Sequence, residues 1–184
     1  MVMKIGIWPA ENVDMTVLSR INDGLVRIFP ETTSLIFDER LPLSQEAFDK
    51  KRGQYRSNQV LSTIQRYAID KKMDRVLGIL NVDIFLPGLN FVFGEAAFPG
   101  KAALISLWRL KPEFHRSPPN RDIFAERSLK EAIHEVGHTL GLRHCPRSSC
   151  VMHFSNSIFD TDKKQALLCD ECSLQVAIAI NSLK

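Results

Sequence analysis

The 184-residue sequence lacks long hydrophobic runs and dense clusters of one charge. No window reaches the roughly 18 apolar residues of a membrane-spanning helix, so a membrane is not an expected partner. The start of the chain, MVMKIGIWPAENVD, has no charged segment followed by a long apolar one, which argues against a secretory signal. A net charge of +3 without a Lys/Arg run argues against nucleic acid as a partner. The composition, 45% hydrophobic and 24% charged, is typical of a soluble globular protein, which we expect in the cytoplasm.

Cysteine is absent from the first 144 residues, and all four cysteines follow in the spacing C-x4-C and C-x2-C. In a reducing compartment such clusters are more often metal ligands than disulfides. Four thiolates can surround a tetrahedral zinc ion in a closed, structural site. A redox C-x-x-C is the alternative, but its position outside the early βαβ region does not resemble thioredoxin. We therefore favour structural zinc, with the predicted ligands Cys145, Cys150, Cys169 and Cys172.

Apolar spacing in the first 110 residues predicts alternating strands and helices. This order favours a mostly parallel sheet, and the closely spaced last two strands favour an antiparallel edge. The segment 38–56 is polar and is expected to be irregular. The expected strands are 4–8, 32–37, 75–87, 91–98 and 102–110, and the expected helices are 13–29 and 57–72.

The remainder of the chain is expected to hold two more helices around a polar, weakly periodic segment. The first runs from about Asp122 to Leu142, with an apolar ridge that packs on the sheet. The second covers 169–184. We expect one catalytic domain with two parts, an α/β part over 1–144 and a small C-terminal part over 145–184.

The stretch HEVGHTLGLRH, residues 134–144, predicts an open metal site. On a helix His134 and His138 are four residues apart, so both can bind one metal ion, while Glu135 lies beside it. Gly141 permits a turn that could return His144 to the same ion. A chance match to this pattern has a probability on the order of 10⁻⁵. Three imidazoles on zinc leave a fourth position for water, whose pKa then falls to roughly 7.

The combination HEVGHTLGLRHC, x4-C-x-M and a downstream C-x-x-C resembles the archaemetzincin family of metzincin-type zinc metallopeptidases. VDIFLPGLNFVFGEA (82–96) and RLKPEF (109–114) are also similar to that family. The resemblance implies zinc ligands at His134, His138 and His144, a general base at Glu135, and a Met-turn residue, Met152, beneath the metal. The strand pair at 91–110 would align the substrate. The sixteen residues 153–168 are one fewer than the family's spacing between the methionine and C-x-x-C.

The implied fold is metzincin-like and belongs to the α/β (α+β) class. It has a mixed, mostly parallel twisted sheet with an antiparallel edge strand, a backing helix, an active-site helix and a small zinc-stapled C-terminal subdomain. The seven candidate ligands divide into three plus four, so we expect two zinc ions per chain. In an extended segment His144 and Cys145 point in opposite directions, which lets each side chain face its own metal. His153 could lie near the active site or replace a cysteine, but a loop histidine is favoured, as it is for His115.

The expected function is zinc-dependent hydrolysis of peptide bonds, with Glu135 activating a zinc-bound water and then protonating the leaving amine. The expected partner is a peptide or protein substrate. Cleavage inside or at the end of a chain, and the oligomeric state, are left open. One alternative is a catalytically weak zinc-binding protein that acts as a peptide-binding module, although such a module would not need Glu135. Another is a hydrolase of a non-peptide amide.

Overall fold

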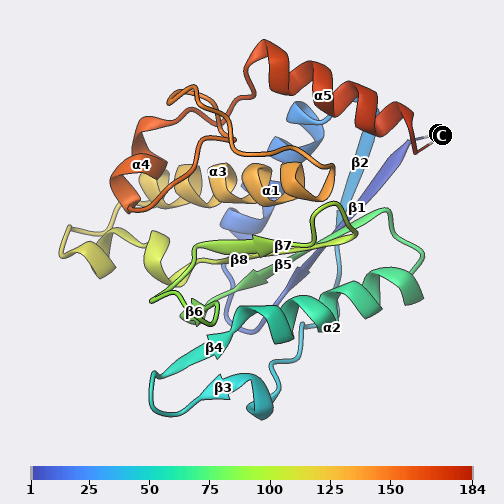
Figure 1. Ribbon diagram of the computed structural model, residues 1–184. Coiled ribbons are helices and arrows are strands. Elements are labelled where there is room, and N and C mark those ends of the chain that lie inside the picture. The colour runs from blue at the N-terminus through green and yellow to red at the C-terminus, as the bar shows by residue number, and fades with distance from the viewer. Residues whose placement is uncertain (1, 184) are drawn as a thin grey trace.

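The computed structural model describes residues 2–183, and within them the largest element is a five-stranded sheet (Figure 1). Its order is β2–β1–β5–β8–β7, and all neighbouring strands run parallel except β7, which pairs antiparallel with β8 at one edge. The predicted mixed, mostly parallel sheet with an antiparallel edge strand is therefore confirmed. The strands are β1 (Met3–Pro9), β2 (Thr32–Ile36), β5 (Arg75–Leu80), β7 (Gly94–Ala96) and β8 (Ala102–Ser106).

Helices cover both faces of this sheet (Figure 1). One face packs against α1 (Met15–Ile28) and α3 (Arg121–Thr139), and the other packs against α2 (Ser57–Asp70). Asp14 caps α1 by accepting a hydrogen bond from the backbone N–H of Thr16, and Asn120 caps α3 through the N–H of Ile123. All six residues of β5 are buried, as expected for a strand covered on both faces.

A second sheet lies below the main one, beside α2 (Figure 1). In the described part of the chain it has three strands in the order β3–β4–β6. Two predictions are therefore wrong: 38–56 is not irregular throughout, and 75–87 is not one strand, because β5 ends at Leu80. The new strands are two or three residues long, too short to produce a periodic signal. They are β3 (Phe48–Asp49), β4 (Gln54–Arg56) and β6 (Ile84–Phe85), and the 3-10 turn η1 (Gln45–Ala47) precedes them.

Both strands predicted for 91–110 form, but they are shorter than expected. The segment before Gly94 is a loop, and the chain after Ser106 coils into two 3-10 turns, η2 (Trp108–Leu110) and η3 (Pro112–His115). The helix predicted to reach Leu142 ends at Thr139, because the chain turns back at Gly141.

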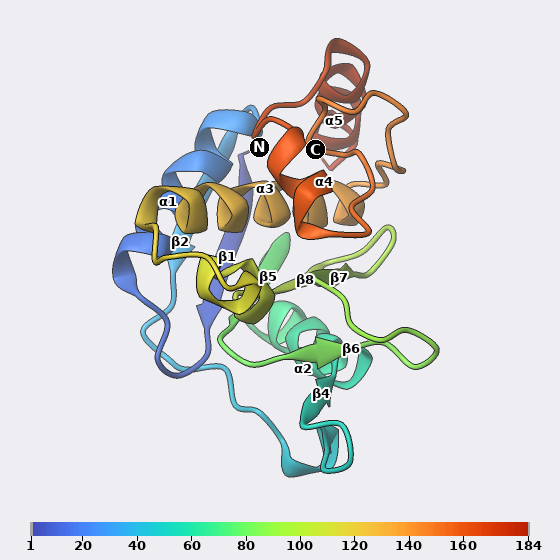
Figure 2. The ribbon, with the colours of Figure 1, turned by 90° about the vertical axis from the view of Figure 1, so that its left-hand side faces the viewer.

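The C-terminal part lies beyond α3, away from the main sheet (Figures 1 and 2). It contains α4 (Ile158–Lys163), which weak periodicity concealed, and α5 (Asp170–Asn181). A capping box between Ser157 and Asp160 starts α4. Buried residues of this part, among them Val151 and Val176, join the same apolar core as α1 and α3. The core is thus continuous across residue 144.

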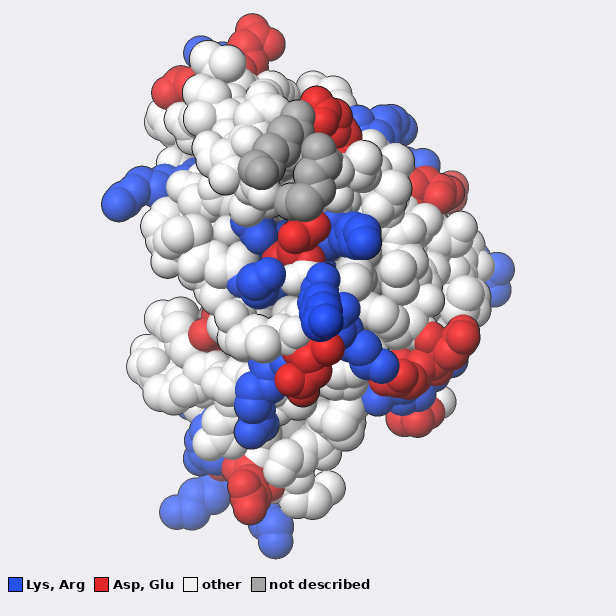
Figure 3. All heavy atoms as spheres, turned by 90° about the vertical axis from the view of Figure 1, so that its right-hand side faces the viewer, with Lys and Arg blue, Asp and Glu red and all other residues white. Residues whose placement is uncertain are grey.

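The surface carries both signs of charge. On the face shown in Figure 3, Lys and Arg side chains are interleaved with Asp and Glu side chains. Among the described residues, no helix combines the length and the apolar character that crossing a membrane requires.

Replacing Gly24 with valine should destabilise the fold. A Cβ at this position would lie 2.2 Å from Cδ1 of Leu129, which is completely buried between α1 and α3. Overpacking of this kind costs about 1–3 kcal/mol, so the free energy of unfolding should fall by that amount in urea titrations. Ser19→Val, at an exposed position of the same helix, is the control and should change it little. Equal effects of the two substitutions would contradict the close packing.

Candidate metallopeptidase active site

The carboxyl end of α3 brings three histidines together. His134 and His138 lie one turn apart on the helix, and the chain then reverses at Gly141, whose φ is +88°. The reversal is a Schellman turn: the N–H of Leu142 donates to the carbonyl of Gly137, and that of Gly141 to the carbonyl of His138. Glycine adopts this left-handed conformation without a steric penalty. The turn returns His144 to the helix, so that one ring nitrogen from each histidine lies within 4.8 Å of the others.

The hydrogen bonds of the rings prepare two of these nitrogens to bind a cation. Nδ1 of His134 lies 2.9 Å from the carbonyl oxygen of Val151, and Nδ1 of His138 lies 2.7 Å from that of Leu142. Because a carbonyl oxygen only accepts, each Nδ1 must carry the proton, and the neutral ring then presents a lone pair at Nε2. The two Nε2 atoms are 3.0 Å apart. Facing lone pairs at this distance fit a shared cation such as Zn²⁺.

Burial favours the neutral form of all three rings. It lowers the pKa of His134, His138 and His144, and the nearby positive charge of Lys164 lowers each of them further. His134 is buried, His138 is half-buried, and His144 is exposed beside the ring of Phe154. Neutral imidazoles are the form that binds metal.

Glu135 is a buried carboxyl group between the helix and the edge strand β7. Only 6% of the residue is exposed, and burial raises its pKa well above the usual range, with a further contribution from the charge of Glu131. Gly94 makes room for it: a Cβ there would lie 2.6 Å from Cγ and 2.7 Å from Oε1 of Glu135. The sequence reading did not identify Gly94, although a glycine in a strand often marks a close approach.

Met152 lies against α3 at the position where the helix has no side chain. It is completely buried, and its Sδ would be 2.5 Å from a Cβ on Gly137. Its carbonyl oxygen accepts a hydrogen bond from the N–H of Cys145, 2.9 Å away. Gly137, which lies between the two helical histidines in the sequence, therefore allows the methionine to pack directly against α3.

The four cysteines form a separate group, in which the four Sγ atoms all lie within 4.8 Å of one another. Sγ of Cys145 and Sγ of Cys169 are 3.8 Å apart. A disulfide would bring the two sulfurs to about 2.05 Å. In a tetrahedral zinc–thiolate site, any two sulfurs are about 3.8 Å apart. A hydrogen bond from the N–H of Cys172 at the start of α5 lowers the pKa of Cys169 to about 7, whereas burial raises the pKa of Cys145 and of Cys172. A cation bound among the four sulfurs would favour the thiolate form of all of them.

Two other histidines lie outside both groups. Nδ1 of His153 contacts the carbonyl oxygen of Cys145 at 2.8 Å, and Nε2 of His115 contacts that of Arg109 at 2.7 Å. Neither belongs to the ligand clusters found among residues 2–183. His153 therefore fits the prediction of a loop histidine, whereas His115 ends the 3-10 turn η3.

A buried ion pair, which no local sequence pattern indicates, lies one helical turn before Glu135. Nζ of Lys164 is 3.0 Å from Oε1 of Glu131, and the two side chains are 0% and 3% exposed. The hydroxyl of Thr161 donates to the same carboxylate. Nearby, Arg127 forms a bidentate pair with Asp162, with both distances 2.7 Å. These contacts attach the end of α4 to the active-site helix.

The histidines and Glu135 open into a cleft of about 420 Å³. Residues 89–96 form one wall and residues 154–156 form another. A neighbouring hollow, lined by Ala96, Phe98 and Arg143, adjoins His138 and His144. The wall at 89–96 includes the edge strand β7, which therefore borders the same cleft as the histidines and Glu135.

Comparisons with known proteins agree with this site. The model of peptidase family M54 matches residues 15–177. The archaemetzincin of Methanocaldococcus jannaschii is 43% identical over 172 residues, covering 94% of this chain and 92% of the relative. The archaemetzincin of Pyrococcus horikoshii is 50% identical over 127 residues, which cover 68% of this chain and 67% of the relative.

Solved structures show the same likeness. The crystal structure of archaemetzincin from Methanopyrus kandleri matches with a TM-score of 0.87 at 33% identity, covering 98% of this chain and 96% of that one. A zinc-dependent peptidase from Methanocorpusculum labreanum matches with a TM-score of 0.83 at 26% identity. The match covers 94% of this chain and 99% of that one. The fold and site are those of a zinc metallopeptidase of family M54. Within that class, the chain belongs to the archaemetzincins, as the sequence motifs indicated.

Replacing Gly137 with alanine should destabilise the protein, although alanine normally stabilises a helix by about 1 kcal/mol relative to glycine. The added methyl group would overlap Met152, and we expect a net loss of about 1–3 kcal/mol in the free energy of unfolding. The test is a double-mutant cycle with Met152→Ala, measured by urea unfolding. The cost of Gly137→Ala should shrink when the methionine side chain is absent. An undiminished cost would assign the effect to another contact.

Proposed function

We propose that this protein hydrolyses peptide bonds, with His134, His138 and His144 holding a zinc ion and Glu135 acting as the general base. One observation carries the proposal: the Nε2 atoms of His134 and His138 lie 3.0 Å apart, in an open cleft that a buried carboxyl group, Glu135, also lines. Zinc held by three imidazoles supplies a Lewis acid and lowers the pKa of water to roughly 7. The description of one structural neighbour as a zinc-dependent peptidase supports this assignment.

Glu135 has the position and the environment for proton transfer. Burial raises its pKa, and a divalent cation beside it would counter that shift and favour the carboxylate. The carboxylate can then take a proton from the attacking water and give it to the leaving amine. Gly94 leaves room for this side chain, which a Cβ at that position would overlap.

The edge strand β7 offers a surface for the substrate backbone. The carbonyl of Phe93 accepts a hydrogen bond from the N–H of Ser106, and the N–H of Ala97 donates to the carbonyl of Ala102, so both of these groups face β8. By the alternation of an antiparallel pair, the backbone groups of Gly94 and Ala96 point toward the cleft. An extended peptide could pair with them as an added strand. A peptide or protein is therefore the substrate class that this wall favours.

We assign a second, structural zinc ion to Cys145, Cys150, Cys169 and Cys172. The 3.8 Å separation of Sγ of Cys145 and Sγ of Cys169, and the grouping of all four sulfurs within 4.8 Å, support this assignment. The site would staple residues 145–184, which bring Met152 against α3, to the remainder of the domain. The Met-turn role of Met152 and the division at residue 144 are part of the same proposal.

The alternative, a zinc-binding module that only binds peptides, makes no use of a general base. A buried carboxyl group is costly to keep without a function or a partner. The glycine that accommodates Glu135 is likewise unnecessary for binding alone. Peptide hydrolysis is therefore the reading that accounts for the most features of the cleft.

Glu135→Gln should abolish most turnover while preserving metal binding. Glutamine keeps the size of the side chain but cannot accept the proton, so kcat should fall by roughly 10²–10⁴-fold. The measurement is cleavage of a randomised peptide library, with zinc content determined on the same samples. Glu126→Gln, on the same helix but outside the cleft, is the matched control. Activity of Glu135→Gln equal to the wild type would refute the assigned role.

Cys145→Ser should empty the cysteine site and weaken the histidine site as well. Cys145 follows His144 directly, and its N–H holds the carbonyl of Met152. We expect zinc affinity at the histidines to fall by roughly 10-fold or more, as for other supporting contacts around metals. Zinc titrations monitored by metal content test this, with Ser148→Ala in the same loop as the control. Unchanged affinity at the histidines, with the cysteine site empty, would disprove the link.

A further inference from the structure

The wall of the cleft begins with a short segment, residues 89–93, which we name the cleft rim. It follows the turn Leu86–Leu89, in which the N–H of Leu89 donates to the carbonyl of Leu86, 2.9 Å away. Gly88 has a φ of +95°, and a positive φ at the third residue is what a type II turn requires. The rim has no long strand or helix of its own, so its shape depends on contacts from other parts of the chain.

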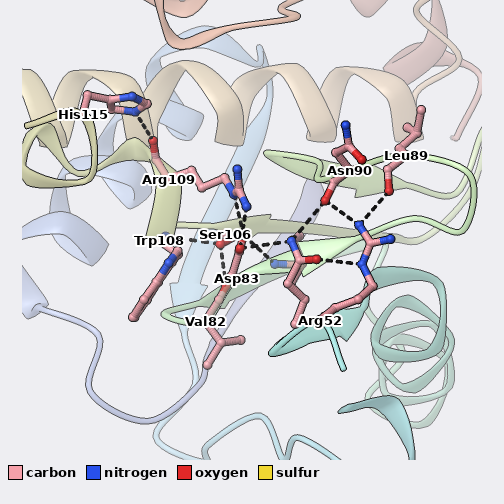
Figure 4. Close-up of polar contacts among 11 residues, drawn as sticks. Arg52, Val82, Asp83, Leu89, Asn90, Ser106, Trp108, Arg109 and His115 are labelled. Atoms are coloured by element: carbon pink, nitrogen blue, oxygen red, sulfur yellow. Dashed lines mark hydrogen bonds and ion pairs between the residues drawn. The ribbon is translucent and has the colours of Figure 1, made fainter. Parts of the chain in front are cut away.

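Arg52 supplies the largest set of these contacts (Figure 4). Its Nη2 donates to the carbonyl oxygens of Leu89 and Asn90, at 3.0 and 2.7 Å. Its Nε donates to Oε1 of Gln54, and the amide nitrogen of Gln54 donates in turn to the carbonyl of Asn90 and to Asp83. One charged side chain, that of Arg52, thus forms hydrogen bonds with two consecutive carbonyl groups of the rim.

The β3–β4 hairpin fixes the position of Arg52. The carboxylate of Asp49 accepts hydrogen bonds from the N–H groups of Lys51 and Arg52, and Gly53 turns the chain with a φ of +66°. The guanidinium of Arg52 also lies 4.0 Å from the centre of the Phe85 ring, on β6. The small second sheet therefore presents Arg52 to the rim.

Arg109 holds the other end of the rim. It forms a bidentate pair with Asp83, with both distances 2.7 Å, and its guanidinium lies 4.3 Å from the centre of the Phe91 ring. Phe91 in turn contacts Phe93 edge to face. Figure 4 shows Arg52 and Arg109 on either side of Asp83. Neither arginine lines the cleft itself.

We propose that Arg52 is a positioning residue for peptide binding, which acts by holding the cleft rim in the shape that receives the substrate. The proposal rests on the proposed function. A rim freed from Arg52 would have to become ordered each time a peptide binds, and that entropy cost appears in the affinity. The histidines and Glu135 lie on or after α3, which Arg52 does not contact, so the chemical step should be little affected. Arg52 is exposed, so its replacement should not prevent folding.

The test is Arg52→Gln, assayed with peptides that the wild type cleaves in a randomised decapeptide library. KM should rise roughly three- to tenfold, as expected for losing charge-assisted hydrogen bonds at an exposed site, while kcat stays within about twofold. Amide hydrogen exchange should accelerate in residues 86–93 and stay unchanged in α3. Arg52→Lys, which keeps the charge but not the fork of donors, should recover only part of the affinity. Arg20→Gln, which breaks an exposed ion pair with Glu126, is the control and should match the wild type.

Peptide affinity is also measured as Kd in the Glu135→Gln background, which separates this proposal from the proposed function. If the wild type cleaves no library peptide, the peptidase assignment fails, and the Kd values with and without Arg52→Gln still decide the role of the rim. Unchanged KM, Kd and exchange in residues 86–93 would overturn the proposal. A fall in kcat or in zinc content with KM unchanged would also overturn it, because it would indicate general damage to the fold.

Discussion

The carbonyl groups of Val151 and Leu142 determine which nitrogen of His134 and His138 is protonated, and the chemistry available in the cleft depends on that choice. With both Nδ1 atoms donating, both Nε2 lone pairs face the same point. These two carbonyls come from segments that the chain reaches only after α3 has ended. The facing of the two Nε2 atoms therefore depends on the turn that follows α3 and on the segment at Val151 that packs back against the helix.

Three glycines make this arrangement possible, each for a different steric reason. Gly141 lets the chain reverse in a left-handed conformation, Gly137 admits Met152 against α3, and Gly94 leaves space for Glu135. At Gly137 and Gly94 a side chain would overlap Met152 and Glu135, and at Gly141 it would be strained by the positive φ. The shape of the cleft therefore depends on these three positions as well as on its polar side chains.

The main sheet, its helices and the two ligand clusters were predictable from local patterns. Apolar runs such as 4–8 and the fixed spacing of the histidines and cysteines are contained in short stretches of sequence. The second sheet was not predictable, because strands such as Phe48–Asp49 are too short to show a period. Long-range polar pairs were also hidden, since Glu131 and Lys164 are far apart in the chain and each resembles an ordinary surface charge. Only the folded structure brings these two side chains into contact, so no local sequence pattern can predict the pair.

The shortness of β7 has a consequence for what the cleft can accept. This strand spans only Gly94–Ala96, and one side of it is already paired with β8. A polypeptide that joins its free side must itself be extended there and must have its own backbone groups unpaired. Helices and internal strands of folded proteins do not meet that condition. The geometry would therefore confine attack to chain ends, loops and unfolded segments, and a native protein would be protected by its own secondary structure.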